Sequence, residues 1–110
     1  MKNQICLAFV LVTSPAFADV PVVEAVEISG SRVSVTLSHA DTGWDHYADG
    51  WRIETEDGTV VGTRELLHPH VNEQPFTRSL TVSELPEEPI FIRARDNVDG
   101  WAPTVFYVQR

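Results

Sequence analysis

A strand pattern is followed directly by a turn pattern in the stretch Gly50-Trp51-Arg52-Ile53-Glu54-Thr55-Glu56-Asp57-Gly58. Trp51 and Ile53 alternate there with charged residues, and this period of two is typical of a β-strand with one buried face. Asp57-Gly58 then favours a hairpin turn, because glycine accepts the positive φ angle that such turns require. The stretch predicts a half-buried strand, with Trp51 in the core, that turns back at Asp57.

Similar strand patterns recur on both sides of this stretch, and no segment has the period of an amphipathic helix. Besides 50–55, strands are expected at 23–28, 32–38, 59–67, 76–82, 90–95 and 104–108. Seven short strands joined by turns favour an all-β, antiparallel sandwich. The chain has one cysteine, Cys6, so the sandwich has no intrachain disulfide.

Three motifs in the second half of the chain are informative, namely Leu85-Pro86, the strand Ile90–Asp96 and Gly100-Trp101. With Trp51 as the core aromatic of the third strand, they resemble fibronectin type III and immunoglobulin-like domains. The resemblance implies a seven-strand sandwich and no particular activity, because such sandwiches host many functions. The chain departs from the immunoglobulin pattern because it lacks the inter-sheet cysteine pair. Segments 43–51 and 67–78 also resemble a group of small exported bacterial proteins of unknown function.

Residues 1–18 predict a secretory signal peptide. Lys2 precedes a short apolar stretch, and Ala16-Phe17-Ala18 is typical of a cleavage site. The apolar stretch is too short to cross a membrane as a helix, so no membrane insertion is expected. Cys6 lies before the cleavage site without the small-residue context of a lipoprotein cysteine, which argues against a lipid anchor. We therefore expect one domain at 19–110, periplasmic or secreted.

The predicted mature chain is strongly acidic, since its seven arginines face sixteen carboxylates for a net charge of −9. Such a surface argues against nucleic acid as a partner, because nucleic acid selects basic patches. The sequence has no nucleophile elbow, phosphate-binding loop, HExxH zinc motif or dinucleotide fingerprint. We therefore expect a monomeric protein that is not an enzyme.

Three segments rich in histidine and tryptophan are expected to meet at one end of the sandwich. Connections in an antiparallel sandwich alternate between its two ends, which brings 39–51, 66–75 and 95–101 together. This end is called the loop pole below. Loops on a rigid sandwich commonly carry binding function. The sequence therefore predicts a non-catalytic extracytoplasmic binding module whose loop pole engages a protein, a glycan or an envelope component.

Aromatic side chains are the first candidates for such a surface. Trp44, Tyr47 and Trp101, together with Asp45, are predicted to form a binding platform at the loop pole. The alternative is that the aromatic rings form a small core that ties the long loops down.

Arg78 is an unusual residue for its position, because alternation with Phe76 and Leu80 turns it toward the core. A buried guanidinium requires a carboxylate partner, and Glu73 or Asp96 is expected to supply it, so that Arg78 braces the loop pole as one of its binding residues. The alternative is a bulge that turns Arg78 outward.

A second hypothesis is a periplasmic protein that binds a transition metal. The motif His68-Pro69-His70 sets two imidazoles on one side of an extended segment, where they can share zinc, copper or nickel. His39 or His46 is expected to complete the site, with a carboxylate from Asp41, Asp45 or Glu73. The alternatives are histidines that bond only to the loops and their carboxylates, and a pH-responsive role.

Calcium is a weaker candidate for the loop pole. Aspartates such as Asp96 and Asp99 provide the hard oxygen ligands that calcium prefers, but they lack EF-hand spacing. Asp and Asn also favour turns by bonding to their own backbone.

Overall fold

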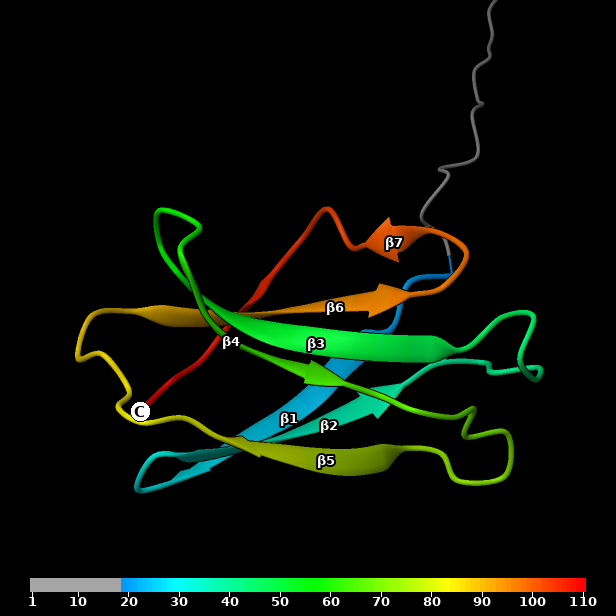
Figure 1. The fold of residues 1–110 in the computed structure, drawn as a ribbon, viewed down its shortest axis with the longest axis horizontal. Coiled ribbons are helices and arrows are strands. Elements are labelled where there is room, and N and C mark those ends of the chain that lie inside the picture. The colour runs from blue at the N-terminus through cyan, green and yellow to red at the C-terminus, as the bar shows by residue number, and fades with distance from the viewer. Residues whose placement is uncertain (1–18) are drawn as a thin grey trace, which may run out of the picture.

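The computed structural model describes residues 19–110, which form two antiparallel sheets packed face to face (Figure 1). One sheet has the order β1-β2-β5, with β1 at Val22–Ser29, β2 at Arg32–Ser38 and β5 at Phe76–Thr81. The other has the order β4-β3-β6, with β4 at Val60–Glu65, β3 at Ala48–Thr55 and β6 at Ile90–Asp96. This confirms the predicted all-β sandwich. The predicted signal peptide, residues 1–18, lies outside the described residues.

The free edge of β6 pairs with two further short strands, β7 at Gly100–Trp101 and β8 at Phe106–Tyr107. The described chain therefore has eight strands where seven were predicted, and the strand expected at 104–108 shrinks to two residues. The N–H of Ala102 still donates to the carbonyl of Ala94 at 2.8 Å, but Pro103, the next residue, has no N–H to donate. The final strand is interrupted at that point.

The core lies between the inward faces of β2, β3 and β6. Its fully buried side chains are Val33, Val35, Leu37, Trp51, Ile53, Ile90 and Ile92. They occupy alternate positions, as the period of two predicted, and Trp51 is the largest of them. Along one side the sheets approach closely, since a Cβ atom added to Gly62 in β4 would lie 3.0 Å from the side chain of Leu80 in β5.

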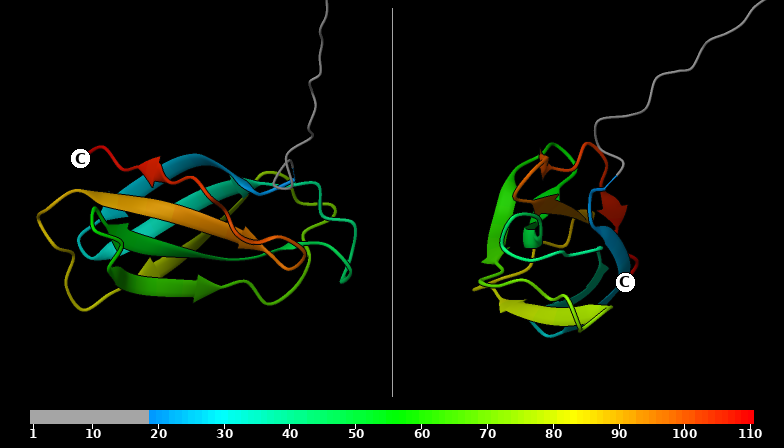
Figure 2. Two further views of the ribbon diagram at one scale, coloured as in Figure 1. Left: turned by 90° about the horizontal axis from the view of Figure 1, so that it is seen from above. Right: turned by 90° about the vertical axis from the view of Figure 1, so that its right-hand side faces the viewer.

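The connections after β2, β4 and β6 meet at one end of the sandwich, on the right in Figure 1, and a further view is given in Figure 2. They span residues 39–47, 66–75 and 97–99. The alternation of connections therefore predicted their common end. Among the described residues, no helix is long and apolar enough to span a membrane.

Candidate metal centre at the loop pole

Two polar side chains lie at the loop pole where the inward-facing positions of two strands end. His39 follows β2 directly and continues the inward positions of Val35 and Leu37, while Asp96 ends β6 and continues those of Ile92 and Ala94. Both His39 and Asp96 are buried. The alternation along β2 and β6 therefore places an imidazole and a carboxylate at the end of the core that faces the loop pole.

A third side chain, that of His46, completes this cluster. One ligand atom from each of His39, His46 and Asp96 lies within 4.8 Å of the other two. The rings of His39 and His46 meet edge to face with their centroids 4.8 Å apart, and Nε2 of His46 lies 2.7 Å from Oδ2 of Asp96. Two imidazoles and a carboxylate form a ligand set that zinc and related transition metals accept.

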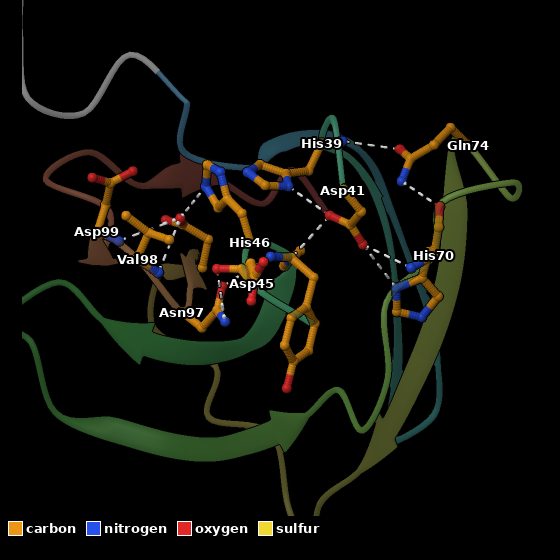
Figure 3. Close-up of polar contacts among 12 residues, drawn as sticks. His39, Asp41, Asp45, His46, His70, Gln74, Asn97, Val98 and Asp99 are labelled. Atoms are coloured by element: carbon orange, nitrogen blue, oxygen red, sulfur yellow. Dashed lines mark hydrogen bonds and ion pairs between the residues drawn. The ribbon is translucent and has the colours of Figure 1, made fainter. Parts of the chain in front are cut away.

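Within the described residues, only one oxygen of the Asp96 carboxylate has hydrogen-bond partners. Its Oδ2 atom accepts from His46 and, over longer distances of 3.4 and 3.3 Å, from the backbone N–H groups of Val98 and Asp99 (Figure 3). Its Oδ1 atom is buried and has no hydrogen-bond partner among the described residues. A buried carboxylate oxygen without a partner is destabilising, and a bound cation would relieve this cost.

Asp41 holds His39 in place from the other side. Its Oδ1 atom lies 2.6 Å from Nδ1 of His39 and accepts from the N–H of Ala48 at 3.0 Å, while its Oδ2 atom accepts from the N–H of His70 at 2.8 Å (Figure 3). Burial by itself raises the pKa of Asp41, but the hydrogen bonds from His39, Ala48 and His70 outweigh it and hold the pKa below its ordinary value. Asp41 is therefore an anion that accepts hydrogen bonds from three parts of the loop pole.

The contact with Asp41 also determines which nitrogen of His39 can bind a metal. When Nδ1 donates its proton to the carboxylate, Nε2 carries a free lone pair. Metal-ligating histidines commonly have such a carboxylate on the other ring nitrogen, which fixes the tautomer and orients the ring. Asp41 is thus placed to orient His39 as a ligand without binding the metal itself.

An open pocket of about 600 Å³ gives access to the cluster. Its lining includes His39, His46, Gln74 and Asp19. Gln74 accepts from the N–H of His39 and donates to the carbonyl of His70, so the wall of the pocket is tied to the loop after β4. An ion can reach the two imidazoles from solvent by this route.

Another carboxylate, that of Asp99, lies close to the cluster. Loss of solvent around it, and then the negative charge of Asp96, raise the pKa of Asp99, and the charge of Asp19 acts in the same direction. Negative charge therefore concentrates around His46.

The motif that predicted the metal site, His68-Pro69-His70, lies beside this cluster and outside it. The two rings are neighbours, with centroids 4.7 Å apart, but His68 is exposed and its Nδ1 bonds to the carbonyl of Pro69. His70 is buried and stacks on Phe76 with the ring centroids 3.7 Å apart. Among the described residues, the side chains whose ligand atoms converge are His39, His46 and Asp96, and neither His68 nor His70 is among them.

The expected aromatic platform is divided between two places. Trp44 and Tyr47 meet edge to face with centroids 5.6 Å apart, and Trp44 is 66% exposed. Trp101 lies elsewhere, on the outer face of the larger sheet, where the guanidinium groups of Arg52 and Arg95 lie 4.1 and 5.1 Å from its ring centroid. The three rings do not meet because Trp101 pairs with Arg95 as part of β7.

The loop that carries Trp44 is fixed by Asn97. Its side-chain oxygen accepts from the N–H of Tyr47, and its amide donates to the carbonyls of Trp44 and Asp45. Asp45, the acidic residue predicted for the binding platform at the loop pole, is exposed.

Arg78 pairs opposite Val35 and so shares the inward side of its strand. Its guanidinium binds both carboxylate oxygens of Glu73, at 3.1 and 3.3 Å, and the hydrogen bond from Arg78 holds the pKa of Glu73 below its ordinary value. Because β5 is an edge strand, the side chain stays 25% exposed at the margin of the sandwich.

The sequence interpretation missed Asp96 as a partner of the histidines. The signal was present, since Ile90, Ile92, Ala94 and Asp96 occupy alternate positions and place an acid on the buried face. An acid at a core position calls for a cationic or hydrogen-bonding partner.

No family model matches the chain. A protein of Halomicrobium mukohataei named "Putative lipoprotein" is 49% identical over 70 residues, which cover 62% of this chain and 34% of that protein. The chain thus spans about a third of the length of this relative. The crystal structure of hypothetical protein PH1083 from Pyrococcus horikoshii OT3 is similar at a TM-score of 0.47 and 20% identity, covering 89% of this chain and 96% of that one.

Proposed function

We propose that this protein is an extracytoplasmic module that binds a transition metal, with zinc as the first candidate, through His39, His46 and Asp96. The observation that carries the proposal is the buried Oδ1 atom of Asp96, which lies beside two imidazoles and has no hydrogen-bond partner within residues 19–110. Zinc binds neutral imidazole and carboxylate at about 2.0 to 2.2 Å, usually in tetrahedral geometry. The set supplies three of the four ligands that zinc takes.

The metal would take the place of a proton. In the metal-free arrangement His46 and Asp96 share one hydrogen bond of 2.7 Å. Tetrahedral zinc holds its ligand atoms roughly 3.3 Å apart, so this pair must open by about half an ångström as His39 moves closer. Binding therefore displaces the proton that lies between the two groups, either to solvent or to Nδ1 of His46.

The proposed role is binding rather than catalysis. The sequence carries none of the catalytic motifs of the common hydrolase and nucleotide-dependent families. The open pocket leaves a fourth coordination position accessible from solvent, which suits an exchangeable ion.

Thermal unfolding of chelator-stripped protein tests this function. A metal at about 100 times its dissociation constant adds roughly 2.7 kcal/mol to the folded state, or several degrees for a domain of this size. We expect such a shift with zinc, a shift lost in His46→Gln and kept in the control His68→Gln, and little effect of calcium. No shift with zinc, copper or nickel, or an equal shift in His46→Gln, would show that the His46–Asp96 pair only fastens the loop.

A second candidate function is supported by the apolar rim of the loop pole. Trp44, Leu67, Val71 and Val98 are 66, 71, 50 and 59% exposed. Exposed apolar side chains on loops held by hydrogen bonds suit a protein, glycan or envelope partner. Binding of the wild type to cell-envelope fractions, lost in a Trp44→Ala and Leu67→Ser double variant whether or not metal is present, would favour this role. Retention in the double variant would exclude it.

We also infer that the sandwich is of the fibronectin type III or immunoglobulin-like kind. The strand order supports this, because the fourth strand lies beside the third in the sheet that also holds β6, as the added strand C′ does in variable-type immunoglobulin domains. Export is supported by the pattern of residues 1–18 and by the name of the Halomicrobium mukohataei relative.

A further inference from the structure

Asp19 lies at the mouth of the metal pocket. In the pairing of β1 with β2, Val22 stands opposite Ser38, and continuing this antiparallel register sets Pro21 opposite His39 and Asp19 near Asp41. Pro21 is buried, which fixes the path of the chain here, and Asp19 itself is exposed and lines the pocket together with His39 and His46. Figure 3 shows this blue segment passing the rings of His39 and His46.

The position of Asp19 in the sequence adds a second ligand atom. Cleavage after Ala16-Phe17-Ala18 makes Asp19 the first residue of the mature chain, with a free α-amino group. An α-amine has an ordinary pKa near 8, so at neutral pH a metal can displace its proton. The α-amine and side-chain carboxylate of one aspartate can close a chelate ring on a borderline metal such as zinc, copper or nickel.

We infer that Asp19 completes the metal site through its free α-amine and its carboxylate, so that the site matures only when the signal peptide is removed. The inference rests on the proposed metal-binding function, and the two atoms of Asp19 raise the set from three ligand atoms to five, a number that zinc also accepts. Together with Asp96, the carboxylate of Asp19 gives two negative charges to balance a divalent ion in a partly buried site. Before cleavage the nitrogen of Asp19 is an amide without basic character, so the precursor holds the metal weakly.

The composition of the chain allows a direct test. Lys2 is the only lysine and leaves with the signal peptide, so the α-amine is the only amine of the mature chain. Protein exported to the periplasm and purified from it, with its first residue established by mass spectrometry, is treated with an amine-acetylating reagent and then with hydroxylamine to clear esters. Zinc affinity is measured by competition with a chromophoric chelator for the untreated, acetylated and Asp19→Asn proteins, with Glu56→Gln, an exposed change at the opposite end of the sandwich, as the control.

We expect acetylation to weaken zinc binding by about tenfold or more. Asp19→Asn should weaken it less, Glu56→Gln should leave it unchanged, and the melting temperature of the metal-free protein should stay constant throughout. Equal affinity before and after acetylation, or a mature chain that begins at another residue, would overturn the role of Asp19 and leave the three-residue site intact. Failure of the untreated protein to bind zinc would overturn the proposed function itself.

Discussion

Oδ1 of Asp41 lies 2.6 Å from Nδ1 of His39, and both side chains are buried. The same carboxylate accepts from the backbone of Ala48, where β3 begins, and of His70, in the loop after β4. One side chain therefore ties two loops to a strand and presents Nε2 of His39 to the cluster. Stability and ligand orientation depend on the same group.

Replacement of Asp41 by Asn should destabilise the fold by roughly 3 kcal/mol, because the amide cannot accept all the hydrogen bonds that the buried carboxylate accepts. Chemical denaturation measures this loss. Asp45→Asn, an exposed change in the same loop, serves as the control and should stay within about 0.5 kcal/mol of wild type. A loss of less than about 1 kcal/mol for Asp41→Asn would mean that the loops are held by other contacts.

Stability should fall on acidification because of His70. Burial, and then the positive charges of Arg78 and His68, lower the pKa of His70, and Asp41 opposes them only in part. The unfolded chain takes up a proton near pH 6.5, which the folded state resists, so the free energy of unfolding decreases as the pH falls below about 7.

His70→Gln removes this titration. The variant should be less stable at every pH, because it loses the ring stacked on Phe76, but its stability should change less between pH 7.5 and pH 5.5. Denaturation at the two pH values makes the comparison. An equal change in both proteins would mean that His70 titrates alike in the folded and unfolded states.

Glu54→Gln should cost about 2 kcal/mol. Glu54 is 3% exposed and accepts from Arg52 at 2.6 Å and from Arg93 at 2.8 Å. Burial raises the pKa of Glu54, yet the hydrogen bonds from Arg93 and Arg52 outweigh it and lower the pKa overall. Glu56→Gln is the matched control, since Glu56 is exposed and should tolerate the change. Urea denaturation of the two variants tests the difference, and equal stabilities would refute it.

Trp101→Leu should cost roughly 1 to 2 kcal/mol without affecting zinc binding. Its ring contacts the guanidinium groups of Arg52 and Arg95 on the outer face of the larger sheet, and it is not part of the cluster of His39, His46 and Asp96. Thermal unfolding with and without zinc separates the two effects. A zinc-induced shift that disappeared in Trp101→Leu would show that the sheet face and the loop pole are coupled.

Alternation along the chain predicted the strands that form the core. Val33, Val35 and Leu37 in β2 and Ile90, Ile92 and Ala94 in β6 face inward as their period of two required. The length of the last strand could not be predicted in this way. It depends on which backbone groups meet β6, and Pro103 interrupts that pairing.

The sequence predicted the end of the sandwich where the histidines gather, but not which of them would meet. The alternation of connections brings the three loops together, whereas the convergence of His39, His46 and Asp96 depends on the course of the loop between β2 and β3. The spacing of His68 and His70 suggested a shared ion, but Phe76 stacks on His70 and Asp41 binds its N–H. Asp41 lies 29 residues from His70 in the sequence, and neither contact is indicated by the spacing of the histidines.

The central claim is that a metal binds His39 and His46, and a zinc titration followed by NMR of the imidazole nitrogens tests it most directly. The account predicts that Nε2 of His39 and of His46 shift together as zinc is added, while Nδ1 of His39 remains protonated against Asp41 and the rings of His68 and His70 change little. A titration in which His68 and His70 respond first, or in which no ring responds, would contradict it.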